Sequence, residues 1–173
     1  MNKYLKNEIG IIENYPFFDS RGSFLKIANN ELSDMQIDEV FYSISEKNVI
    51  RGFHLQKNPN QIKKIVTCVK GEIVDVCIDI RKNSKNFGKI YEYTLNSENN
   101  KSLFVPFGFA HAFLSNSSET IVLYLQSGEH VHSSEIGFNP LSAGFDWGIK
   151  NPIISQRDLS LPTYEEFKEN INL

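Results

Sequence analysis

Apolar and polar residues alternate in short runs along much of the chain, and turn-forming residues separate the runs. A period of two residues predicts β-strands, because successive side chains of a strand point to opposite faces of a sheet. Strands are expected over residues 48–56, 62–69 and 72–80. In the last run apolar residues share one face opposite Asp75, Cys77 and Asp79, which is the pattern of a half-buried strand with carboxylates on one side.

Many short strands in so few residues must fold over on themselves to bury their apolar face, which predicts a sandwich or a barrel. A polar inner face of such a fold indicates a ligand cavity, and in the run 120–126 Tyr124 points to the more polar side. Near the C-terminal end, Thr163 and Glu166 have the spacing of a capping box, so a short peripheral helix is expected there.

The length and net charge of the chain limit the classes of function that it can have. The 173 residues suffice for one domain, expected to span 1–173, and a net charge of −3 gives no electrostatic reason to expect nucleic acid or an anionic membrane as a partner. Cys68 and Cys77 lie in apolar runs, and the first ten residues lack the apolar core of a signal peptide. A cytoplasmic protein with reduced thiols is therefore expected.

Two histidines stand in distinctive settings. The stretch RGFHLQ places His54 beside Arg51 and on the same strand face as Gln56, although a single histidine is more often structural than functional. In the stretch 105–113, proline, one residue, glycine, two residues and His111 follow in the order typical of cupin-type jelly rolls.

Many cupins bind a metal through that last histidine together with a His-x-His cluster on an earlier strand, but the earlier stretch here offers only His54. His130 and His132 do form a His-x-His pair, without a carboxylate or third imidazole in matching register, and are expected to be exposed loop histidines. No metal site is predicted.

Six motifs in a fixed order give the chain a wider resemblance. Between Tyr15 and Pro162 it resembles the dTDP-4-dehydrorhamnose 3,5-epimerase family. The motifs are 18–24, 51–56, Lys64-Ile65-Val66 leading to Gly71, 75–81, 106–113 and 155–158. The resemblance implies an all-β cupin-type jelly roll, a double-stranded β-helix with a short C-terminal helix. It also implies a homodimer that acts on nucleotide-linked 4-keto-6-deoxy sugars without metal or redox cofactor.

Epimerisation beside a ketone requires a base, a group that stabilises the enolate oxygen, and a proton donor on the opposite face. By its match to the family motifs, His54 is expected to be the base, and Asp158 to hydrogen-bond it. Lys64 matches the cation near the ketone oxygen and Tyr124 matches the proton donor. The residues expected to contact the substrate are Arg21, Arg51, Gln56, Ser43, Ser45, His111, His130, Glu135 and Arg157.

Four positions depart from the family pattern. Ser43 and Ser45 stand where dTDP-specific members have a Gln-x-Asn pair, Lys26 replaces a glutamate, and His130 replaces a tyrosine that stacks on thymine. Several residues that would recognise the nucleobase differ, while the expected catalytic residues are retained. This combination argues for a nucleobase other than thymine.

The departures are similar to those of relatives in bacterial capsule pathways, and they lead to the expectation of a GDP-6-deoxy-4-keto-heptose epimerase that inverts C3, or C3 and C5. Three alternatives stay open: a dTDP-4-dehydro-6-deoxyglucose 3,5-epimerase of dTDP-rhamnose biosynthesis, a sugar-nucleotide 3,4-ketoisomerase, and a non-enzymatic cupin.

Overall fold

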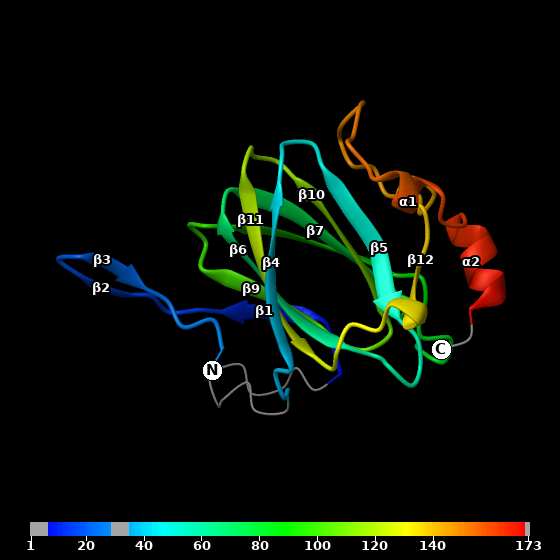
Figure 1. Ribbon diagram of the computed structural model, residues 1–173, viewed down its shortest axis with the longest axis horizontal. Helices are drawn as coiled ribbons and strands as arrows, with labels where there is room; N and C mark the ends of the chain where they lie inside the picture. The colour runs from blue at the N-terminus through cyan, green and yellow to red at the C-terminus, as the bar shows by residue number, and fades with distance from the viewer. Residues whose placement is uncertain (1–6, 29–34, 172–173) are drawn as a thin grey trace.

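Two five-stranded antiparallel sheets pack face to face in the computed structural model, which describes residues 7–28 and 35–171 (Figure 1). The first sheet has the order β1 (Gly10–Glu13), β9 (Lys101–Val105), β6 (Lys63–Lys70), β11 (Thr120–Ser127) and β4 (Glu39–Ser45). The second has the order β12 (Glu135–Gly137), β5 (Ile50–Gln56), β10 (Phe109–Ser115), β7 (Glu72–Asp79) and β8 (Ile90–Asn96). The predicted all-β jelly roll is confirmed.

The inner faces of the two sheets form one apolar core. Val66, Leu103 and Val122 of the first sheet meet Phe109 and Phe113 of the second, and all five are almost completely buried. Complete burial of one such side chain stabilises a fold by about 1.5–3 kcal/mol, so this layer holds the sheets together.

A second apolar core covers the outer face of the second sheet. There Val76 and Ile78 of β7 pack with Phe138, Trp147 and Phe167 of the C-terminal segment. The prediction of a half-buried strand over 72–80 is wrong, because the C-terminal segment covers the apolar face while the opposite face, with Asp75 and Cys77, is buried toward the first sheet.

The C-terminal helices belong to this covering layer (Figure 1). The predicted capping box is confirmed at the start of α2 (Tyr164–Asn170), where the Thr163 hydroxyl accepts from the Glu166 amide and the Glu166 side chain accepts from Thr163. Helix α1 (Gln156–Leu159) is a single turn. No helix among residues 7–28 and 35–171 is long and apolar enough to cross a membrane.

A hairpin of β2 (Phe17–Asp19) and β3 (Gly22–Phe24) extends away from the sandwich (Figure 1). Its aromatic side chains are not covered by the chain itself: Phe17 is 66% exposed, Phe18 68% and Phe24 60%. Exposed aromatic residues gathered in this way are unusual on a surface that meets only water.

Candidate active site

The space between the sheets opens into a cavity of about 990 Å³. Its walls come from β4 and β11 on one side, from β5 and β10 on the other, and from the segment 153–158. Register explains why its polar groups meet: His111 of β10 pairs with His54 of β5 on one side and with Cys77 of β7 on the other. Paired residues of antiparallel strands project to the same face, so all three side chains point inward.

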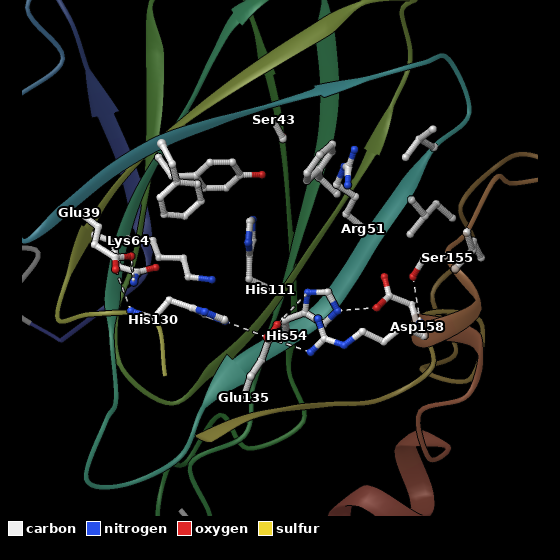
Figure 2. A pocket seen from close by; sticks show the side chains of 18 of the residues that line it. Glu39, Ser43, Arg51, His54, Lys64, His111, His130, Glu135, Ser155 and Asp158 are labelled. Atoms are coloured by element: carbon white, nitrogen blue, oxygen red, sulfur yellow. Dashed lines mark hydrogen bonds and ion pairs between the residues drawn. The ribbon is translucent and has the colours of Figure 1, made fainter. Parts of the chain in front are cut away.

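His54 and Asp158 form the shortest polar contact in the cavity. The distance between His54 Nε2 and Asp158 Oδ1 is 2.7 Å (Figure 2). Asp158 is held in place from two directions, since the Ser155 hydroxyl caps its amide at 3.0 Å and the Gly52 amide donates to its carboxylate at 3.4 Å. Burial raises the pKa of Asp158, but the hydrogen bonds with His54, the Gly52 amide and Ser155 lower it by more. The pKa of Asp158 is therefore below its usual value.

The second ring nitrogen of His54 faces the cavity. Its Nδ1 atom lies 3.7 Å from a carboxylate oxygen of Glu135, beyond hydrogen-bond distance. When Nε2–H donates to Asp158, Nδ1 carries the lone pair and can accept a proton. Glu135 in turn accepts from His130 at 2.9 Å and from Arg157 at 2.8 Å. Burial raises the pKa of Glu135, but these two partners outweigh burial, so the carboxylate stays ionised beside the base.

Tyr124 approaches from the opposite sheet. Its ring stacks on Phe41 at 4.9 Å between centroids and 16° between planes, which fixes the direction of the phenol. Burial raises the pKa of Tyr124 well above its usual value, so the phenol keeps its proton at neutral pH. It therefore suits the role of a proton donor facing the base across the cavity.

Lys64 brings a cation into the same space. Its side chain and that of His111 lie on one side of His54, and Asp158 lies on the other (Figure 2). Burial lowers the pKa of the Lys64 ammonium, while the nearby Glu135 carboxylate opposes this effect. No hydrogen bond or ion pair of the ammonium occurs within the part of the chain that the structure describes, so its protons are available to a ligand oxygen.

His111 has an acidic partner that the sequence reasoning did not assign. Its Nε2 atom lies 2.9 Å from Asp75 Oδ2, and both side chains are buried. Cys77 adds a thiol to this pair, and among the described residues these three form the one group of potential metal ligands. The alternation over 72–80 placed Asp75 and Cys77 on one face, and this was the signal that could have found the group.

Most of the expected site residues line the cavity, whereas three do not. Ser45 lies behind the wall and accepts from Arg51 Nε at 3.0 Å, so it positions that guanidinium. The Gln56 amide is used within the fold, because it donates to the carbonyl oxygens of Asn60 at 2.8 Å and Glu129 at 3.1 Å. Arg21 sits in the turn of the protruding hairpin and pairs with Asp19. The expected residues that do line the cavity are Ser43, Arg51, His54, Lys64, His111, Tyr124, His130, Glu135, Arg157 and Asp158.

The cavity also contains acidic and amide groups that the motifs did not indicate. Glu39 accepts from the amide of His130 at 3.1 Å and from Gln126 Nε2 at 3.1 Å, which fixes the loop that carries His130. This end of the cavity therefore carries two carboxylates, Glu39 and Glu135. Arg157 pairs with Glu135 and brings a cation to the same end, and Arg51 also lines the cavity.

Known proteins are similar to this chain in both sequence and fold. The family model described as dTDP-4-dehydrorhamnose 3,5-epimerase matches residues 6–166. The dTDP-4-dehydrorhamnose 3,5-epimerase of Shigella flexneri is 34% identical over 161 residues, which cover 88% of this chain and 89% of that protein.

Two solved structures extend the likeness to three dimensions. The dTDP-4-dehydrorhamnose 3,5-epimerase of Sulfolobus tokodaii superposes with a TM-score of 0.86 at 37% identity, covering 91% of each chain. The corresponding enzyme of Bacillus anthracis, solved with TDP and PPi bound, gives 0.85 at 32% identity, covering 90% of this chain and 94% of that chain.

Fold, cavity and relatives together define a jelly-roll isomerase that epimerises nucleotide-linked sugars. The chain belongs to the dTDP-4-dehydrorhamnose 3,5-epimerase family.

Proposed function

We propose that this chain is a 3,5-epimerase of a dTDP-linked 4-keto-6-deoxyhexose. One observation carries the proposal: a histidine with a free ring nitrogen and a protonated tyrosine project into one cavity from opposite sheets. A sugar ring between them presents one face to His54 and the other to Tyr124. Removal of a proton on one face and its return on the other inverts the carbon.

The steps follow from the positions of the groups. His54 Nδ1 takes the proton from the carbon beside the ketone, and the electron pair of the broken C–H bond moves onto the ketone oxygen. Lys64 stabilises the resulting enolate, and the carboxylates of Asp158 and Glu135 stabilise the imidazolium. Tyr124 then delivers its proton to the opposite face of the carbon as the C=O bond re-forms. The tyrosine proton and the imidazole proton exchange with water before the next turnover.

The nucleotide is proposed from the relatives. The similar enzymes carry dTDP substrates in their names, and the Bacillus anthracis structure holds TDP. These comparisons support the dTDP-linked alternative of the sequence analysis, and they give no support to the GDP-linked heptose of a capsule pathway.

One feature favours guanine as a second candidate base. The cavity end around His130 carries the carboxylates of Glu39 and Glu135, which only accept hydrogen bonds when ionised. A guanine edge offers a ring N–H and an amino group side by side, whereas thymine offers a single N–H between two carbonyl oxygens. Glu39 and Glu135 have donors within the protein but only acceptor atoms to offer, so a thymine carbonyl oxygen beside them would gain no hydrogen bond from either carboxylate.

We also propose that the chain acts as a homodimer in which the β2–β3 hairpin contacts the second copy. The aromatic side chains of the hairpin are exposed in the single chain. The hairpin leads away from its own sandwich, so Arg21, which lies in the hairpin turn, can reach a cavity only in a neighbouring molecule (Figure 1). Sedimentation should give a dimer for the wild type and a monomer for Phe17→Ser with Phe18→Ser. Phe87→Ser, at an exposed position in another loop, is the control and should stay dimeric.

The activity is tested in deuterated water with dTDP-linked and GDP-linked 4-keto-6-deoxy sugars in parallel. Proton NMR reports which C–H positions exchange and which carbons are inverted. We expect exchange at C3 and C5 of the dTDP sugar and none with the His54→Asn variant. Faster turnover of the GDP sugar would overturn the proposed base, and a shift of the carbonyl to C3 would identify a ketoisomerase instead. Binding without any exchange would contradict enzymatic function.

A further inference from the structure

A group of three buried side chains lies at the inner wall of the cavity, where the proposed proton transfers do not use it. Asp75, Cys77 and His111 each offer one ligand atom, and these atoms lie within 4.8 Å of one another. Asp75 Oδ2 is 2.9 Å from His111 Nε2, and Cys77 Sγ is 3.8 Å from Asp75 Oδ1. Strand geometry explains the cluster, because Asp75 and Cys77 share one face of β7 and His111 is the register partner of Cys77.

The three donor types are those that zinc-class ions prefer. An imidazole nitrogen, a thiolate sulfur and a carboxylate oxygen bind Zn²⁺ at about 2.0–2.3 Å in a tetrahedral shell, so neighbouring ligand atoms lie about 3.4 Å apart. Two of the separations, 2.9 and 3.8 Å, lie on either side of that value, and the third is within 4.8 Å, so shifts of about 1 Å would bring the atoms into a coordination shell.

Charge and access also fit a divalent ion. A carboxylate and a thiolate together neutralise two positive charges, so the occupied site would be buried without a net charge. His111 lines the cavity, which gives the ion a route from solvent and leaves its fourth coordination position open to water or to a substrate oxygen. The thiol must lose its proton to solvent when the ion binds.

The surroundings of Cys77 argue against a purely structural thiol. The side chain is completely buried in the apolar layer between the sheets, where its thiol donates to the Asp75 carboxylate at 3.8 Å and lies within 4.8 Å of a His111 ring nitrogen. Cys68 is the natural comparison, since it is equally buried but its thiol donates to the Lys70 carbonyl and no imidazole or carboxylate joins it in a cluster within the described residues.

We propose that Asp75, Cys77 and His111 form a binding site for a zinc-class ion, and that an ion bound there inhibits the enzyme. The ion draws the His111 imidazole toward β7 and away from the substrate. It also cancels the negative charge of the Asp75 carboxylate close to Lys64, whose ammonium lies near enough to Asp75 and Cys77 to interact with both electrostatically. This site goes beyond the proposed epimerase activity, which uses no metal.

Cobalt binding tests the site without any substrate. Chelator-treated protein is titrated with Co²⁺, and a thiolate-to-cobalt charge-transfer band is followed in the near ultraviolet. We expect one equivalent to bind with this band in the wild type and in Cys68→Ala, and the band to be lost in Cys77→Ala. Absence of the band in the wild type, its persistence in Cys77→Ala, or its loss in Cys68→Ala would each overturn the proposal.

Inhibition is measured with the same three proteins. Zn²⁺ should slow turnover of the wild type and of Cys68→Ala, and chelation should restore it. Cys77→Ala should keep its activity in the absence of metal. It should need at least about tenfold more Zn²⁺ for the same inhibition, because one of the three ligands is gone. Equal sensitivity of Cys77→Ala would place the inhibition elsewhere and refute the assignment. Should Cys77→Ala fail to fold, Cys77→Val fills the space of the thiol and serves in both tests.

Discussion

His54 Nε2 lies 2.7 Å from Asp158 Oδ1, although 104 positions separate the two residues in the chain. The contact depends on α1, whose N-cap Ser155 holds the amide of Asp158, and on Gly52, whose amide reaches the carboxylate from β5. The strand that carries the base therefore also helps to orient its acidic partner.

Replacing Asp158 by asparagine removes the charge and keeps the shape. The variant should lose activity by on the order of 10²-fold or more, because the imidazolium formed during proton abstraction loses its counter-charge. Rates measured with saturating and limiting substrate should show the loss mainly in kcat. A variant with wild-type kcat would mean that Asp158 has no part in the reaction.

The same variant reports on stability against pH. The pKa of Asp158 is lowered in the folded protein, since the bonds from His54, Gly52 and Ser155 outweigh burial. A carboxylate with a depressed pKa contributes stability above its unfolded pKa of about 3.9 and loses it as pH falls through the folded value. The difference in unfolding free energy between wild type and Asp158→Asn should therefore narrow below about pH 4. A difference that stays constant from pH 6 to pH 3 would contradict this.

Tyr124→Phe should separate the two halves of the reaction. The ring still stacks on Phe41, so the cavity keeps its shape, but the proton donor is lost. Exchange of the C–H proton with solvent should continue, while inversion should slow by about 10²–10³-fold. Deuterium incorporation and product formation are followed in one NMR experiment. Equal loss of both would indicate that Tyr124 binds substrate rather than donating a proton.

Lys64→Met should reduce kcat by about 10²–10³-fold, because the enolate oxygen loses its cation. Lys63→Met is the matched control, since Lys63 is the adjacent strand residue and its ammonium lies over the Phe107 ring at 4.9 Å. In the wild type, activity should decline as pH rises through the lowered pKa of Lys64, that is, below the usual value of 10.5. Persistence of this alkaline limb in Lys64→Met, measured on its residual activity, would assign it to another group.

Gly52→Ala should destabilise the strand that carries His54. The backbone φ of Gly52 is +118°, and an added Cβ would lie 2.5 Å from the His111 carbonyl oxygen and 2.6 Å from the Ala112 Cβ. We expect a loss of about 3 kcal/mol or more in the free energy of unfolding. Gly148→Ala, with φ of +68° and no atom within 4 Å, should cost only about 1 kcal/mol. Similar costs for the two variants in denaturant titrations would refute the argument.

Alternation alone predicts the strands and hence the sandwich, because a period of two is a local property of the chain. It does not reveal that the polar face of β7 is buried as well, since Cys77 on that face shares its buried cluster with Val66 and Val122 of other strands. The contact between His54 and Asp158 came from the resemblance and not from spacing, because no local pattern encodes a contact across 104 positions.

Other site residues could not be placed from the sequence for a similar reason. Gln56 shares its strand with His54, yet its amide hydrogen-bonds the carbonyl oxygens of Asn60 and Glu129, whose paths depend on the whole fold. Arg21 lies in a hairpin turn whose direction no residue type specifies.

The base and the proton donor reside on separate sheets, with His54 on β5 and Tyr124 on β11. Mutations that accumulate on β4 and β11 can therefore reshape one wall around a new sugar while the deprotonating apparatus on β5 and α1 stays intact. This separation allows related enzymes to act on different sugars while they keep the same proton-abstraction chemistry.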